Sequence, residues 1–84
     1  MATIIKTNGE MLRVDPKNGK DFKLQELQEI VGGYIECVYI NDKIQMVVNE
    51  EGKITGLPLN VAASSLARQC IVGDVLVCER KQIK

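Results

Sequence analysis

The side chains best suited to polar chemistry lie between residues 33 and 60 of this 84-residue chain. They include an aromatic ring that can stack, a carboxylate, two amides and one ammonium group. These are the groups that a small polar anion such as a nucleotide requires of a binding site. The candidate ligand-binding residues are Gly33, Tyr34, Glu36, Asn49, Lys53, Gly56 and Asn60.

The segment Gly56-Leu57-Pro58-Leu59-Asn60 enters an expected helix, with Lys53 a short distance upstream. Backbone N–H groups at a helix N-terminus can bind an anion. The spacing is not that of a P-loop or a dinucleotide fingerprint. The segment therefore has two interpretations, as a corner between a strand and a helix or as part of a phosphate site.

The run Gly32-Gly33-Tyr34 also has two interpretations. The glycine pair can end a helix, after which Tyr34 starts a strand as a core residue. Alternatively, the glycines let a ligand approach the backbone while Tyr34 stacks on a base. Alternation along a strand places Glu36 on the same face as Tyr34, where a carboxylate would need a partner or water.

Catalysis is disfavoured because the chain has no His. Ser64 and Ser65 have no neighbouring Lys to activate them, and the carboxylates of Glu50 and Glu51 point apart in a turn. We therefore expect a protein that is not an enzyme.

Metal and cofactor chemistry are disfavoured as well. The three cysteines are odd in number, show no C-x-x-C spacing, and lie in apolar runs. We expect them to be reduced, buried and structural, with neither a metal nor a cofactor bound. They are Cys37, Cys70 and Cys78.

Size and composition indicate a single domain over residues 1–84. Apolar residues make up 45% of the chain, and its aromatic residues are Phe22, Tyr34 and Tyr39. A small aliphatic core is often completed by a partner subunit, so we expect a homo-oligomer.

Charge and the N-terminal sequence limit the partners. Eleven basic residues balance eleven acidic ones, so nucleic acid is an unlikely partner. The one basic cluster, formed by Arg80, Lys81 and Lys84, is interpreted as a solvated tail. Neither a signal peptide nor a membrane-spanning segment is found, so we expect the protein in the cytoplasm.

The first half of the chain predicts a hairpin and a helix. Strands are expected at residues 3–7 and 11–14, joined by an Asn8-Gly9 turn in which both residues adopt positive φ. Apolar residues at helical spacing predict a helix over residues 22–31, with Asp21 as its N-cap.

The second half predicts a hairpin, a helix and a strand. Strands at 34–40 and 44–49 both look largely buried, and the polar turn after them has Gly52 at a positive-φ position. Asn60 caps a helix reaching about residue 69, and an apolar run over 72–78 predicts a central strand. The fold class is α+β in the order β-β-α-β-β-α-β, a mostly antiparallel sheet with two short helices packed on it.

Three motifs in this order resemble a small family found mainly in bacteriophages and mobile elements and catalogued as a domain of unknown function. They are Leu27-Gln28-Glu29-Ile30-Val31-Gly32-Gly33-Tyr34-Ile35-Glu36, the turn from Asn49 to Lys53, and Gly56 to Asn60, followed by Ile71-Val72-Gly73. Members often place a basic residue after the final Asn, where this chain has Val61. The resemblance implies a small accessory protein of phage or plasmid origin.

We therefore expect a non-catalytic protein that sequesters a nucleotide-type immune signal of the host. Tyr34 would stack, Lys53 and N–H groups at Asn60 would contact phosphate, and Glu36 or Asn49 would recognise hydroxyls. The alternative is a small inhibitor that binds a host defence enzyme, for example by adding an edge strand to its sheet.

Overall fold

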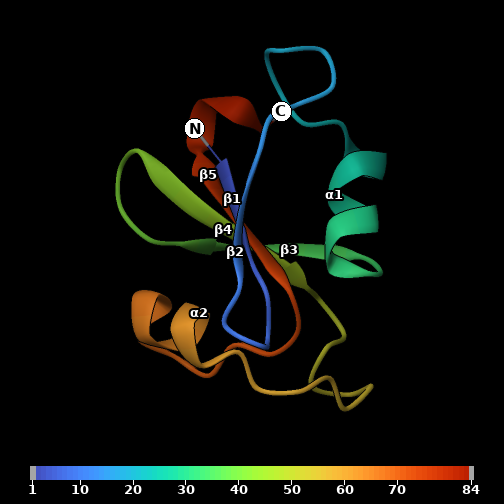
Figure 1. Ribbon diagram of the computed structural model, residues 1–84, viewed down its shortest axis with the longest axis vertical. Helices are drawn as coiled ribbons and strands as arrows, with labels where there is room; N and C mark the ends of the chain where they lie inside the picture. The colour runs from blue at the N-terminus through green and yellow to red at the C-terminus, as the bar shows by residue number, and fades with distance from the viewer. Residues whose placement is uncertain (1, 84) are drawn as a thin grey trace.

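The computed structural model describes residues 2–83 and shows one five-stranded antiparallel sheet with a helix on each face (Figure 1). The elements follow the expected order β-β-α-β-β-α-β, which confirms the α+β class. Their bounds are β1 Ala2–Ile5, β2 Met11–Val14, α1 Leu24–Val31, β3 Ile35–Tyr39, β4 Ile44–Asn49, α2 Val61–Ala67, β5 Val75–Glu79 and a short 3-10 helix, η1, Arg80–Gln82.

The sheet order is β2-β1-β5-β4-β3. Two hairpins, β1–β2 and β3–β4, therefore lie on either side of β5, which pairs with both. The pairing aligns Ile4 with Leu76 and Met46 with Val77. The prediction of a central last strand is confirmed, because Val75 and Leu76 point to opposite faces and both are fully buried.

Alternation along the strands divides the core between the two faces of the sheet. On one face, Leu27 and Val31 of α1 pack with Val47 and Leu76. On the other, Ala63 of α2 packs with Met46, Val48 and Val75, and its small side chain permits a close approach. The α2 helix has only seven residues, so Val38, Ile40 and Val77 on its face are only partly buried.

Strand β3 is at the edge of the sheet, so the expectation that it would be largely buried was wrong. A residue at an edge has a neighbouring strand on one side only, and Glu36, Cys37 and Tyr39 are exposed. The cysteine prediction was also wrong in part, because Cys37 and Cys70 are exposed and Cys78 alone is buried. Leu66 of α2 is also exposed, at 45%.

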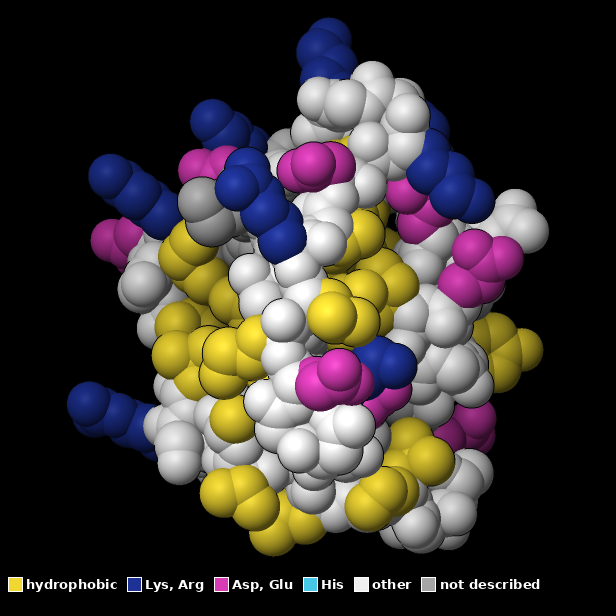
Figure 2. Space-filling view, viewed as in Figure 1, with side chains coloured by type: hydrophobic (Ala, Val, Ile, Leu, Met, Phe, Trp, Pro, Cys, Tyr) yellow, Lys and Arg dark blue, Asp and Glu magenta, His cyan; other side chains and the backbone are white. Residues whose placement is uncertain are grey.

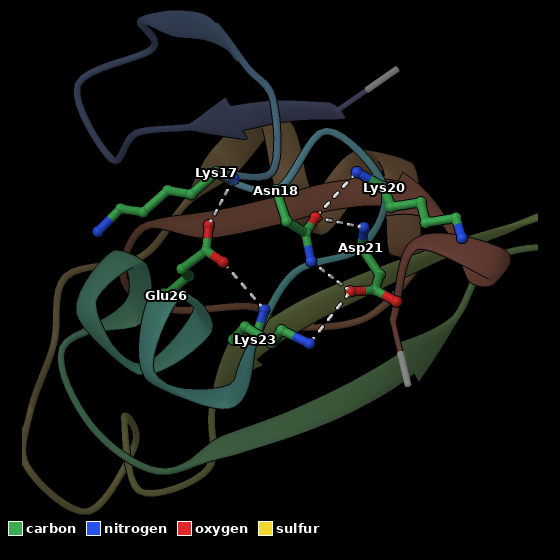
Figure 3. Close-up of polar contacts among 6 residues, drawn as sticks. All are labelled: Lys17, Asn18, Lys20, Asp21, Lys23 and Glu26. Carbon is green, nitrogen blue, oxygen red and sulfur yellow. Dashed lines mark hydrogen bonds and ion pairs between the residues drawn. The ribbon is translucent and has the colours of Figure 1, made fainter.

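Helix α1 begins at Leu24 with Lys23 as its N-cap, so the prediction of Asp21 as the cap was wrong. Phe22 cannot join the helix because its backbone pairs with Ile83. The side chain of Asp21 instead accepts a hydrogen bond from Asn18 Nδ2 at 3.0 Å (Figure 3). The carboxylate of Glu26 accepts from the backbone N–H groups of Lys17 and Lys23, both at 3.1 Å. Together these contacts fix the loop that precedes α1.

Two glycines have other roles than expected. In the first hairpin Gly9 alone has positive φ, because Gly9 N–H donates to Lys6 O and the loop is longer than a two-residue turn. Gly52 does not have positive φ. A Cβ at residue 52 would lie 2.8 Å from Val72 Cγ2. The position therefore favours glycine because there is too little space for a side chain.

Candidate functional site

Three of the candidate residues line one hollow, which we call the corner hollow. Gly33 comes from the end of α1, Tyr34 from the start of β3, and Asn49 from the end of β4. Glu51, Thr55 and Leu57 of the loop that follows β4 also line the hollow. The volume is about 590 Å³. The full lining is Gln25, Gln28, Glu29, Gly32, Gly33, Tyr34, Asn49, Glu51, Thr55 and Leu57.

The backbone of the corner hollow is built by a helix end and one side-chain amide. Gly32 ends α1 in the left-handed conformation, with φ of 81°, and its N–H donates to Gln28 O at 2.8 Å. Asn49 Nδ2 donates to Val31 O at 3.1 Å, and Asn49 Oδ1 accepts from the N–H of Glu51 at 2.8 Å. Asn49 therefore joins the helix end to the loop.

Gly33 allows this close approach. A Cβ on Gly33 would lie 3.0 Å from Asn49 Nδ2, which is tighter than ordinary packing permits. A larger residue would push the Asn49 amide out of its bonds or narrow the hollow. The helix-ending role proposed from the sequence is confirmed for Gly32, whereas Gly33 keeps space beside the Asn49 amide.

Tyr34 is not a core residue, because 65% of its surface is exposed. Its carbonyl accepts a hydrogen bond from Glu50 N–H at 2.9 Å, which continues the β3–β4 ladder by one residue. The ring is thus held at the rim by its backbone and is accessible for stacking.

The charged groups of the corner hollow are carboxylates. Glu29 and Glu51 are among its lining residues, and no Lys or Arg is. The side-chain amides of Gln25 and Gln28 add hydrogen-bond donors and acceptors. This lining suits the base and hydroxyl groups of a nucleoside better than a phosphate.

Glu36 and Lys53 line a different and smaller hollow of about 140 Å³, which we call the flank hollow. Asn49 lines both hollows. Tyr34 lies in the bend just before β3 and lines the corner hollow, whereas Glu36 lies in β3 and lines the flank hollow, so the two residues do not line the same hollow. Glu36 is exposed, so water can solvate its carboxylate.

Gly56 and Asn60 line neither of these hollows. Gly56 is exposed, with φ of 75°, and its role is to turn the chain. Asn60 is fully buried, and its Nδ2 donates to Ile5 O and Gly73 O, both at 2.9 Å.

The remaining polar groups of Asn60 are also used within the chain. Its Oδ1 accepts from Ala63 N–H as the predicted helix cap, and its own N–H donates to Ile71 O. The side-chain amide and the backbone N–H of Asn60 therefore all have partners in the fold, and none of these groups is available for the expected phosphate contact. Its role is structural.

A third hollow, larger than the other two, was not foreseen from the sequence, and we call it the hairpin-end hollow. It has a volume of about 840 Å³ and lies between the β3–β4 turn and η1. Its lining is Asp42, Lys43, Gln45, Glu79, Arg80, Lys81 and Ile83. The sequence signal was the basic Arg80-Lys81 pair, which is interpreted from the sequence as part of a solvated tail. Lys84, the third member of the expected basic cluster, lies outside the described residues.

Two of the three thiols have a raised pKa. Burial raises the pKa of Cys78 to about 11, and partial burial together with Glu36 raises the pKa of Cys37. A raised pKa keeps a thiol protonated at neutral pH and lowers its nucleophilicity. Within residues 2–83, no group of three or more His, Cys, Asp or Glu side chains could hold a metal ion.

Comparison with known proteins gives the family. The family model described as a domain of unknown function, DUF3846, matches residues 2–83. This chain belongs to the DUF3846 family. The match extends well beyond the motifs that suggested a family from the sequence, and covers every strand and helix of the fold.

Other comparisons add no relative of known activity. Searches of the curated proteins and of the solved structures found no match to the chain. Of the helices that the structure describes in this DUF3846 domain, none has the length and apolar composition needed to cross a membrane.

Proposed function

We propose that the protein is a non-catalytic accessory protein of a phage or mobile element that binds and sequesters a nucleotide-type immune signal in the host cytoplasm. The observation that carries the proposal is the convergence of Gly33, Tyr34 and Asn49 on the corner hollow. These residues come from three separate elements, and a volume of about 590 Å³ is in the range of small-molecule sites.

The lining suggests how such a ligand is recognised. Tyr34 stacks on the base, and the amides of Asn49 and Gln28 bind ring or ribose groups. Lys53 lines the adjoining flank hollow together with Asn49, which lines both hollows. A phosphate at the rim between the two hollows would therefore meet Lys53 rather than the helix end at Asn60.

Isothermal titration calorimetry with cyclic dinucleotides and ADP-ribose derivatives tests the proposal. Tyr34→Ala should weaken binding about tenfold or more, because stacking on an aromatic ring contributes about 1–3 kcal/mol per base. Tyr39→Ala is the matched control, since Tyr39 lies at the other end of β3 and is similarly exposed, at 63%. Absence of heat with every compound, or equal losses in both variants, rejects the proposal.

A second candidate is a protein-binding inhibitor, and the open edge at β3 favours it. Glu50 N–H donates to Tyr34 O, and Ile40 N–H to Ile44 O. Alternation of an antiparallel ladder then turns the backbone groups of Ile35, Cys37 and Tyr39 outward, away from β4. Such groups can pair with a strand of a partner protein.

Pull-down from host lysate separates the two candidates. A stoichiometric protein partner that is retained by Cys37→Ser and lost in Cys37→Pro would favour edge pairing, because proline removes an outward N–H without removing a β3–β4 bond. The same open edge could join a second copy of the chain, consistent with the proposed homo-oligomer. Light scattering of the Cys37→Pro variant tests that arrangement, which predicts a smaller mass than for wild type.

A further inference from the structure

The hairpin-end hollow brings together three basic side chains from two distant parts of the chain. Lys43 lies in the turn between β3 and β4, whereas Arg80 and Lys81 lie in η1 after β5. In the space-filling view, basic side chains project at the upper left, over η1 and the hairpin turn (Figure 2). All three residues are exposed and line the same hollow of about 840 Å³.

The backbone that carries these side chains is fixed by hydrogen bonds. Arg80 N–H donates to Lys43 O at 2.8 Å, which ties the two segments to each other. Asn41 Oδ1 accepts from the N–H groups of Lys43 and Ile44 at 2.8 and 2.9 Å. In η1, Gln82 Oε1 accepts from Glu79 N–H at 3.1 Å. The basic groups therefore extend from an ordered frame and not from a free tail.

The local charge balance favours an anion. Three basic side chains face two carboxylates, those of Asp42 and Glu79, in the lining. Asp42 Oδ1 accepts a hydrogen bond from Tyr39 Oη at 2.8 Å, and this bond raises the pKa of Tyr39. Among the described residues, the ion pair found within 4.0 Å joins Lys23 to Asp21, neither of which lines this hollow. Lys43, Arg80 and Lys81 thus have no carboxylate partner among residues 2–83.

We propose that the hairpin-end hollow is a binding site for the phosphate groups of a small polyanion, such as a di- or triphosphate. A guanidinium group binds phosphate oxygens through paired N–H donors, and two ammonium groups add compact charges. The zero net charge of the whole chain favours a small ligand over a nucleic acid. This site is additional to the corner hollow, whose lining contains no Lys or Arg.

Titration with inorganic tripolyphosphate tests the site without assuming a base or sugar. The variant Lys43→Gln/Arg80→Gln/Lys81→Gln should weaken binding at least tenfold. The control variant Lys6→Gln/Lys17→Gln/Lys20→Gln removes the same charge elsewhere and should change the dissociation constant less than twofold. In amide NMR spectra of wild type, saturable shifts are expected at residues 43, 80 and 81.

Several results of these experiments would overturn the proposal. Non-saturable binding, equal weakening in both triple variants, or shifts centred on residues 17–20 would overturn the proposal by showing general charge attraction. Tight binding of a single-stranded oligonucleotide without binding of tripolyphosphate would also overturn it, in favour of a nucleic-acid surface. Tyr34→Ala should leave tripolyphosphate binding unchanged, so failure here is distinguishable from failure of the corner-hollow proposal.

Discussion

The corner hollow and the hairpin-end hollow lie at opposite ends of the β3–β4 hairpin and differ in charge. Each is close to an exposed tyrosine of the β3 segment, Tyr34 at 65% and Tyr39 at 63% exposure. The charged groups of the first are carboxylates, whereas the second has three basic groups against two carboxylates. An exposed aromatic ring therefore says little about the ligand by itself. The groups around it determine whether a neutral or an anionic part of a molecule can bind.

The two ends also differ in how they are held. The segment that follows the corner loop is anchored by the buried Asn60, while the turn at the hairpin end is ordered by the exposed Asn41. Each of these asparagines accepts hydrogen bonds from backbone N–H groups, but only Asn60 also donates to buried carbonyls. The difference can be measured as the loss of unfolding free energy when each asparagine is replaced by alanine.

The largest expected effect is that of Asn60→Ala, which should lower the free energy of unfolding by about 3–5 kcal/mol. The change removes a helix cap and leaves the buried carbonyls of Ile5 and Gly73 without their donor. Asn41→Ala, the matched control, should cost about 1 kcal/mol because water can replace its bonds. Urea denaturation measures both, and equal losses would remove the distinction between the two ends.

Gly52→Ala should destabilise the fold by about 1–2 kcal/mol, because its Cβ would lie 2.8 Å from Val72 Cγ2. This substitution tests how closely the loop after β4, which lines the corner hollow, is packed. In a Val72→Ala background the same substitution should cost much less, since the opposing methyl groups are gone. Undiminished loss in the double variant would show that the cause is not this contact.

Acid should loosen the loop that precedes α1 before it affects the hairpin turn. Hydrogen bonds from the backbones of Lys23 and Lys17 lower the pKa of Glu26. A lowered folded-state pKa means that the stabilisation is present above the ordinary Glu pKa and is lost as pH falls through the folded value. Amide exchange should show this loss at Lys17 and Lys23, after correction for intrinsic rates.

The contrast is with the amides of Lys43 and Ile44, which donate to the neutral side chain of Asn41. Their protection should not follow the same titration. In Glu26→Gln the acid transition at Lys17 and Lys23 should disappear, and its persistence would mean that another group is responsible.

The smallest expected effect is on the stability of the Lys43→Gln/Arg80→Gln/Lys81→Gln variant. We expect a change of less than about 0.5 kcal/mol, because these are exposed side chains without ion pairs among the described residues. Thermal unfolding with and without tripolyphosphate measures this. A large loss in the absence of ligand would indicate that the basic cluster supports the fold instead of a ligand.

Local patterns predicted much of the fold. Branched and aromatic residues identified the strands, the pair Gly32-Gly33 ended α1, and Asn60 was recognised as a cap. These signals work because each depends on the conformation of a few neighbouring residues. The edge position of β3 was not predicted, because the sequence of an apolar strand looks the same whether one or two strands pair with it.

The candidate sites depend more on long-range pairing. Gly33, Tyr34 and Asn49 converge because Ile35 pairs with Asn49 in a hairpin, which is a short-range event. Lys43 meets Arg80 because Ile44 pairs with Glu79, a register between segments far apart in the chain. The burial of Asn60 likewise arises from contacts with Ile5 and Gly73. No local sequence pattern around Asn60, or around Lys43 and Arg80, indicates these long-range contacts.

The position of β5 between the two hairpins has a consequence for how the protein is made. Until residues 75–79 leave the ribosome, the β1–β2 and β3–β4 hairpins have no strand to join them, and an isolated hairpin is marginally stable at best. Nascent chains therefore cannot complete this sheet from the N-terminus onward. Cooperative folding of the sheet therefore starts only once β5 is available. By then all the earlier strands and helices have been synthesised.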